Sequence, residues 1–275
     1  MDWLFLIGVI GNGLIIIHFL WKNKDSLRKM SSYNFLIIIL AAVDCLLCFL
    51  LVIPIEFLPA LRLTMTSTSR SFSCWILVFL SFDRFRSIVH PFKGKFSKRR
   101  YLTILIIAVL VLFFYYLTWD LRSKYTPLSQ GGIVFSEFLL VSIMETVVPT
   151  ALMYWFYRRI SRKIQSDMMQ STMPGYNGPS LKRKLKAMYI LKLLIAVYIF
   201  SIVPGRIYIP IDQLLFNSLD VSISITTRRH ALSAAHFLLY VNNRVNVFIY
   251  IYLMDDFRRF LIKTFTCNLL KKENL

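Results

Sequence analysis

Seven long apolar segments, separated by short polar connections, constrain this chain more than any other feature of its sequence. They cover residues 4–20, 33–57, 66–89, 101–119, 133–157, 187–210 and 232–253. Most of them reach the roughly 20 residues that a helix needs to cross the hydrocarbon of a bilayer. Inside a bilayer every backbone polar group must be satisfied within the protein, and the alternation typical of a membrane β-barrel is absent from these segments. The sequence therefore predicts an all-α membrane protein, a seven-transmembrane helix bundle.

The composition also favours a membrane over water. Of the 275 residues, 57% are hydrophobic, which is more than one soluble core can bury. The four cysteines show neither metal-ligand spacing nor a disulfide framework. The first apolar segment has no basic residue before it and no good cleavage site after it, so it is expected to be a signal anchor.

Basic residues gather in alternate connections and thereby predict the orientation. They stand between the first and second, third and fourth, and fifth and sixth segments, and again after the seventh. The positive-inside rule then places the amino terminus outside and the carboxyl terminus in the cytoplasm, and we expect a multi-pass protein of the plasma membrane. The net charge of +19 is a topology signal and an attraction to anionic membrane lipids, so no nucleic acid is expected as a partner.

The chain divides into two predicted parts. Residues 1–254 form the transmembrane domain, and residues 255–275 form a cytoplasmic amphipathic helix and tail. The helix is indicated by basic residues between apolar ones at helical spacing, which are Phe257, Phe260, Leu261 and Phe265.

Two further features lie on the cytoplasmic side. Cys267, at the end of the amphipathic helix, is a candidate acceptor for a palmitoyl chain, and an unmodified thiol is the alternative. Residues 166–180 are rich in Pro, Gly, Ser and Asn, which predicts a flexible loop.

Charged residues within or at the end of a span need an explanation. Asp44 stands in the middle of the second segment, where an ionised group costs at least about 2.5 kcal/mol unless it finds a partner. A neutral, hydrogen-bonded carboxyl group is one alternative. Asp83 and Arg84 end the third segment, where they either anchor the helix at the headgroups by snorkelling or carry a function.

Six motifs in order resemble those of the rhodopsin-like (class A) G-protein-coupled receptors, and the resemblance covers nearly the whole chain. They are Gly11-Asn12 in the first segment, Asp44 in the second, Asp83-Arg84-Phe85 with Ile88, Pro91 and Phe92 after the third, Pro149 and Tyr157 in the fifth, Pro204 in the sixth, and Asn246 to Tyr250 followed by Phe257. The resemblance implies a divergent receptor with a shortened extracellular half. Such a receptor is not an enzyme, and it passes an extracellular ligand signal to heterotrimeric G proteins by outward movement of the sixth helix.

The resemblance also implies a switch at the cytoplasmic side. Asp83 is expected to hold Arg84 at rest, and on activation Arg84 extends toward Tyr157 and Tyr250. A planar guanidinium that is always charged and can stack suits such a switch. Phe92 is expected to be an apolar knob that fits the G protein.

The family's sodium pocket and hinges have counterparts here. Oxygen ligands suit a hard cation, and an allosteric sodium ion that favours the resting state is expected among Asp44, Ser73, Asn242, Asn246 and Asn12. Pro149 and Pro204 are expected to kink the fifth and sixth helices and act as hinges. No cofactor is expected beyond this ion and the palmitoyl chain on Cys267.

The sequence departs from the family pattern in the sixth segment. Ile202 replaces the usual toggle tryptophan. Lys184 stands where an acid often bonds the switch arginine, so no such lock is expected. We therefore expect a weakly restrained resting state with measurable signalling in the absence of agonist.

The ligand is the least determined part. Thr66 takes the place of the aspartate of amine receptors and Tyr240 that of the opsin lysine, which argues against a monoamine and against retinal. Glu145, Arg206 and His236 are further candidates for a ligand pocket, although each alone is more typical of a satisfied bundle residue, and Glu145 and Arg206 are also candidates to pair. A peptide or a small polar molecule remains compatible.

Two alternatives stay open at this point. One is a receptor-like protein that does not signal. The other is a transporter or channel whose ion path is marked by Asp44 and Glu145. A transporter predicts internal repeats, and none is visible in the sequence.

Overall fold

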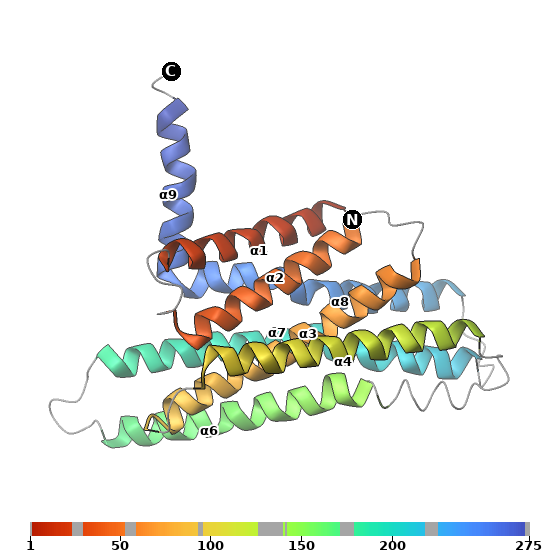
Figure 1. The fold of residues 1–275 in the computed structure, drawn as a ribbon, viewed down its shortest axis with the longest axis horizontal. Helices are drawn as coiled ribbons and strands as arrows, with labels where there is room; N and C mark the ends of the chain where they lie inside the picture. Colours follow the sequence, from red (N-terminus) through yellow and green to blue (C-terminus); the bar gives the residue numbers. More distant parts are fainter. Residues whose placement is uncertain are drawn as a thin grey trace.

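The computed structural model describes residues 2–23, 30–52, 59–92, 96–125, 140, 142–170, 179–217 and 225–272. Within these residues the regular secondary structure is helical, without a strand. The transmembrane helices run side by side as one bundle (Figure 1).

Each predicted segment overlaps one long helix, and residues 53–57 of the second segment and 133–139 and 141 of the fifth lie outside the described residues. The helices are α1 Asp2–Lys22, α2 Ser32–Val52, α3 Pro59–Val89, α4 Lys98–Tyr125, α6 Val148–Gln170, α7 Pro179–Asn217 and α8 Ile225–Leu253. A π-helical turn, Ile143–Val147, leads directly into α6. The fifth, sixth and seventh predicted spans are therefore α6, α7 and α8, and the predicted fold class is confirmed.

The last helix, α9 (Asp255–Lys272), lies crosswise to the bundle (Figure 1). Its Phe257 is fully buried, with its ring centroid 5.3 Å from that of His18 on α1. Phe265, two turns later on the same apolar stripe, is exposed. This is the amphipathic arrangement expected of a helix that lies along a membrane surface. The division of the chain into two domains stays a prediction.

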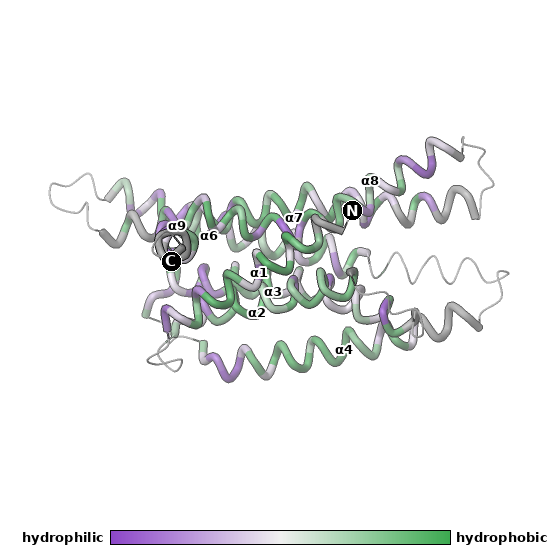
Figure 2. The backbone as a smooth tube through the Cα atoms, turned by 90° about the horizontal axis from the view of Figure 1, so that it is seen from above, coloured by the Kyte–Doolittle hydropathy of each residue, from purple (hydrophilic) through white to green (hydrophobic). Residues whose placement is uncertain are grey.

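The outer surface of the bundle is apolar. Helix α4 lies at its edge and is largely hydrophobic (Figure 2), and its exposed side chains include Ile106, Val111 and Phe114. In the described residues, α1, α2, α4 and α7 each contain a stretch long and apolar enough to cross a membrane. The remaining spans carry more polar residues, which neighbouring helices cover; Ser71 and Ser73 of α3, for example, are fully buried.

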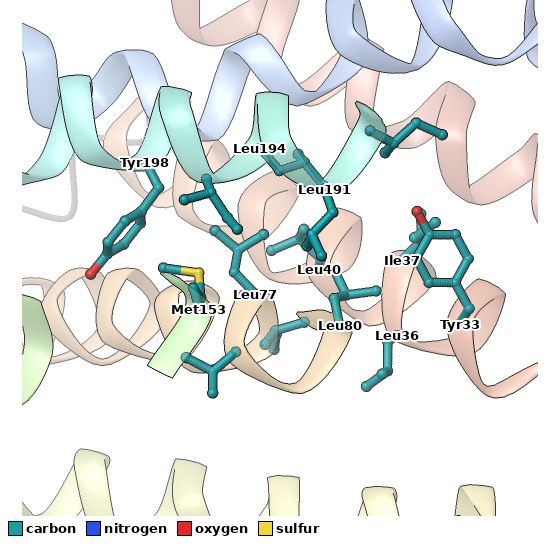
Figure 3. Close-up of a cluster of buried hydrophobic side chains, with 14 of the residues drawn as sticks. Tyr33, Leu36, Ile37, Leu40, Leu77, Leu80, Met153, Leu191, Leu194 and Tyr198 are labelled. Carbon is teal, nitrogen blue, oxygen red and sulfur yellow. The ribbon is translucent and has the colours of Figure 1, made fainter. Parts of the chain in front are cut away.

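The core draws side chains from every helix from α1 to α9 named above. Leu40 of α2, Leu77 and Leu80 of α3, Met153 of α6 and Leu191 of α7 meet in one cluster (Figure 3). Because lipid tails are as apolar as leucine, the stabilisation comes from close packing between helices rather than from escape from water.

One glycine sets the distance between two helices. A Cβ atom on Gly205 of α7 would lie 2.6 Å from Leu239 Cγ and 2.9 Å from the Ala235 carbonyl oxygen, both on α8. A larger residue would push these helices apart, so the close approach depends on glycine.

The structure corrects two predicted boundaries. Helix α3 begins at Pro59, seven residues before the predicted segment. In these added turns Thr64 is buried, and the Arg62 guanidinium donates to the carbonyls of Leu50 and Leu51 on α2. The predicted loop 166–180 is shorter than expected, since α6 continues to Gln170 and α7 begins at Pro179. The rest of that loop, residues 171–178, lies outside the described residues.

Candidate functional site

The guanidinium of Arg84, near the carboxyl end of α3, lies over the ring of Tyr33 at the start of α2. Its Cζ atom is 3.4 Å from the ring centroid, and Tyr33 is buried. A cation over an aromatic face is worth about 0.5–2 kcal/mol, more when water is excluded. The Arg84 Nε atom is buried and has no hydrogen-bond partner among the described residues. Sequence reasoning missed Tyr33, because nothing in the spacing of α2 and α3 indicates which side chains face each other.

The neighbouring carboxylate contacts a different helix. Asp83 accepts a hydrogen bond of 3.3 Å from the hydroxyl of Tyr101 on α4. Tyr101 is fully buried. The contact fixes the inner ends of α3 and α4 to each other.

Two other predicted switch residues lie on α6 and α8, and a third, Phe92, follows α3. Tyr250 of α8 is buried, and its hydroxyl has no hydrogen-bond partner in the described part of the chain. Tyr157 of α6 is partly buried against the core. Phe92, after α3, is 100% exposed. A phenylalanine in that position is available to a partner protein.

Ion pairs connect the inner end of α7 to α6 and α9. Asp167 of α6 accepts from Lys184 of α7 at 3.1 Å and from Lys163, one turn earlier on α6, at 2.9 Å. Lys186 of α7 also pairs with Asp255 at the start of α9. Lys184 therefore pairs with an acid on α6, and this pair leaves untouched the prediction that no acid at position 184 bonds Arg84. Only the spacing of Lys163 and Asp167, four residues apart, was visible in the sequence.

The charges shift the pKa of these acids. Burial alone would raise the pKa of Asp167, but hydrogen bonds from Lys163 and Lys184 hold it below the ordinary value. The pKa of Asp255 is lowered by its hydrogen bond from Lys186. On the next residue of α9, hydrogen bonds from Lys22 of α1 and from Arg259 lower the pKa of Asp256. All three carboxylates are therefore charged at neutral pH.

Asp44 is fully buried and bridges three helices. Its two carboxylate oxygens accept hydrogen bonds from Ser73 of α3 at 2.8 Å and from the side-chain amide of Asn246 on α8 at 2.7 Å. Asn242, one turn before Asn246, is buried as well. The fifth predicted member, Asn12 of α1, is buried and donates to the Gly8 carbonyl of its own helix at 2.9 Å.

This cluster fits a hard cation. Carboxylate, hydroxyl and amide oxygens are the ligands that such cations use in proteins, and the Asp44 and Ser73 oxygens already lie together. The residues that the resemblance placed in a sodium pocket are thus buried, and Asp44 contacts Ser73 and Asn246 directly.

Pro149 explains a second buried cluster. Proline has no N–H, so the carbonyl of Glu145, four residues earlier, loses its helical donor. The hydroxyl of Tyr198 on α7 donates to that carbonyl instead, at 2.7 Å. The chain locally forms the π-helical turn Ile143–Val147, a distortion common at functional sites.

The turn directs the Glu145 side chain inward to an ion pair. Its Oε2 atom lies 2.6 Å from Arg206 Nη2 on α7, and both side chains are almost wholly buried. The Ser71 hydroxyl of α3 donates a hydrogen bond to the other carboxylate oxygen of Glu145. The same hydroxyl lies 2.8 Å from the Tyr116 hydroxyl of α4. Glu145 borders an apolar pocket of about 410 Å³ between α3, α4 and the π-helical turn. Arg206 lies two residues after the second predicted hinge, Pro204.

Two of the remaining candidates for a ligand pocket, Thr66 and His236, form hydrogen bonds within their own helices. Thr66 donates to the Leu63 carbonyl of its own helix at 2.9 Å. The Nδ1 atom of His236 lies 2.8 Å from the Leu232 carbonyl oxygen, also within one helix. The side chains of Tyr240 and Cys267 lie outside the described residues. Sequence reasoning missed two groups. One is the ion pair of buried Asp212 on α7 with the partly exposed Arg228 of α8, and the other is the buried Arg244 guanidinium, which lies 3.9 Å from the Phe5 ring centroid.

Comparison with known proteins agrees with this arrangement. Residues 11–250 match the profile of the 7 transmembrane receptor (rhodopsin family). Human neuropeptide FF receptor 1 is 26% identical over 220 residues, and human melanin-concentrating hormone receptor 1 is 26% identical over 293 aligned positions. The alignments cover 70% and 94% of this chain, and they span 50% and 77% of the two receptors. These relatives are receptors, which agrees with the predicted non-enzymatic role and disfavours a transporter or channel.

Proposed function

Because the chain belongs to the rhodopsin family of seven-transmembrane receptors, we propose that it activates heterotrimeric G proteins in response to an extracellular peptide. The observation that supports this most directly is Arg84, held over Tyr33 at the inner rim of the bundle. Movement of α7, the sixth span, opens the inner end of the bundle. Arg84 is then free to leave Tyr33 and extend toward Tyr157 and Tyr250, beside the exposed Phe92.

The peptide part of the proposal rests on the relatives. They are receptors for neuropeptide FF and for melanin-concentrating hormone. No monoamine-type aspartate stands at Thr66, and the two charges of Glu145 and Arg206 satisfy each other. A ligand that makes many contacts at the outer surface, such as a peptide, does not need a buried charge to bind. The plasma membrane is the proposed location, since an extracellular ligand must reach the outer face.

The Asp44 cluster supplies the proposed allosteric control. Sodium would be held by Asp44 and Ser73, with Asn242 and Asn246 lining the site. It would stabilise the resting packing of α2, α3 and α8, because these three helices supply the oxygens. A palmitoyl chain on Cys267 would fix the far end of α9 to the membrane.

The test uses cells that carry reporters for each class of G protein. The wild-type chain, Arg84→Ala and the control Arg99→Ala are expressed at equal surface amounts, and neuropeptide FF and melanin-concentrating hormone are added in turn. Arg99 is an exposed arginine on α4, so its removal changes charge without touching the switch. We expect a basal or peptide-driven signal that Arg84→Ala abolishes and Arg99→Ala retains. A wild-type signal equal to that of mock-transfected cells under every condition would support a receptor-like protein that does not signal.

A further inference from the structure

A cavity of about 670 Å³ opens at the cytoplasmic ends of α2, α3 and α4. Four of the side chains that line it are basic or can become so, namely Arg84, Arg86, His90 and Lys98. Among the described lining residues the one carboxylate is Asp83, which accepts a hydrogen bond from Tyr101. The charge facing the cavity is therefore predominantly positive.

Hydroxyl groups and two helix starts add to this positive character. Ser31 accepts a hydrogen bond from the Asn34 backbone N–H, and Ser97 accepts one from that of Arg100, so each serine caps a helix. Both serines line the cavity, at the amino-terminal ends of α2 and α4. The first N–H groups of a helix have no partner within it, and its dipole favours an anion at that end.

The two arginines are fixed in place by aromatic rings. Arg84 lies over Tyr33, and its buried Nε atom has no hydrogen-bond partner among the described residues. The Arg86 guanidinium lies 5.8 Å from the Phe82 ring centroid and 5.7 Å from that of Phe96. Pre-positioned guanidinium groups lose little entropy when they bind an anion, and their geometry matches phosphate oxygens.

From this arrangement we propose that the cavity binds a phosphate monoester, the chemistry offered by the headgroup of a phosphorylated inositol lipid. A phosphate monoester carries about −1.5 to −2 charges and three acceptor oxygens, which suits several cations and hydroxyl donors at once. The cavity lies at the cytoplasmic ends of the spans, where the headgroups of an anionic leaflet are found. The proposal rests on the orientation of the chain in the membrane and not on its signalling, so the two can fail separately.

The experiment measures the melting temperature of the full chain in phosphatidylcholine nanodiscs. One sample contains phosphatidylinositol bisphosphate, a second contains phosphatidylserine at matched total charge, and a third contains no anionic lipid but receives soluble inositol hexakisphosphate. We expect the inositol lipid to raise the melting temperature by about 2–4 °C, and phosphatidylserine to raise it clearly less. If the two lipids raise the melting temperature equally, the binding is general charge attraction and the proposal is wrong.

The soluble compound distinguishes the two sources of phosphate. Stabilisation by the lipid alone supports a membrane headgroup, whereas stabilisation by inositol hexakisphosphate as well supports a phosphate site that is also open to soluble anions. No effect of either compound contradicts the site.

A matched pair of variants locates the binding. Arg86→Ala with Lys98→Ala removes two cations from the cavity, and Arg99→Ala with Arg100→Ala removes two exposed cations from the next positions on α4. The affinity for the inositol lipid should fall about fivefold for each cavity cation removed and change little in the control. An equal loss in both double variants would contradict binding in the cavity.

Discussion

Lys184 of α7 and Asp167 of α6 form an ion pair of 3.1 Å. The residues are 17 positions apart and lie on either side of the loop that connects the two helices. The family resemblance implied a weakly restrained resting state, because Lys184 stands where an acid usually bonds the switch arginine. In the structure Lys184 connects α7 to α6 instead, by pairing with the acid Asp167.

Removal of this acid should release α7. We expect Asp167→Asn to raise agonist-free G-protein activation about two- to fivefold, since a partly exposed ion pair is worth up to about 1 kcal/mol. Lys163→Ala is the matched control, because it removes only the pair within α6 and leaves Lys184 bound to Asp167. An unchanged basal signal in Asp167→Asn would mean that the pair does not restrain the moving helix.

The same pair should make stability depend on pH. Because the folded-state pKa of Asp167 is below its ordinary value of 3.8, its stabilising contribution is present at neutral pH and is lost as the pH falls through the lowered pKa. The wild type should therefore melt above Asp167→Asn at pH 7, and this difference should shrink toward zero as the pH falls below 3.8. Thermal unfolding in detergent across this range measures it, and a constant difference would contradict the assignment.

Tyr33 should hold Arg84 through its ring and not its hydroxyl. Tyr33→Phe is expected to keep the resting signal, because a phenylalanine face still attracts a guanidinium. Tyr33→Leu should raise agonist-free signalling about fivefold, the equivalent of about 1 kcal/mol. The comparison uses the same reporters at equal surface expression. If the phenylalanine variant signals as strongly as the leucine variant, the hydroxyl rather than the ring is responsible.

Sodium should act through Asp44. We expect increasing sodium concentration, with potassium as the ionic-strength control, to raise the melting temperature of the wild type and to lower its affinity for an agonist. Asp44→Asn preserves the shape of the side chain but removes the charge that attracts the ion, so both effects should disappear. Sodium dependence that survives in Asp44→Asn would exclude this carboxylate as the site.

The buried pair of Glu145 and Arg206 should behave as a unit. Glu145→Leu leaves a buried guanidinium without its counter-ion, which costs about 3–5 kcal/mol and should lower the melting temperature by roughly 10 °C. The double variant Glu145→Leu with Arg206→Leu should recover most of that loss, since no buried charge remains. Melting temperatures of the two single variants and the double variant complete the cycle. Additive losses would show that the two residues do not stabilise each other.

The helices could be predicted from the sequence because a bilayer leaves the backbone few alternatives. A span of apolar residues must satisfy its own hydrogen bonds, so length and composition alone indicate a helix. The predicted start was too late at α3, where the polar stretch that includes Thr64 was assigned to a connection. Thr64 is helical and fully buried, which is a property of the packing and not of the local sequence.

Side-chain partners were decided by the tertiary structure. The motif residues Asp44 and Asn246 were predicted to share a site, and they are in contact although 202 positions separate them. That prediction came from the family resemblance. Without such a guide, helical spacing gives the face on which a residue lies but not the helix that packs against it. Arg84 over Tyr33 and Lys184 beside Asp167 therefore emerged only when the helices were placed next to each other.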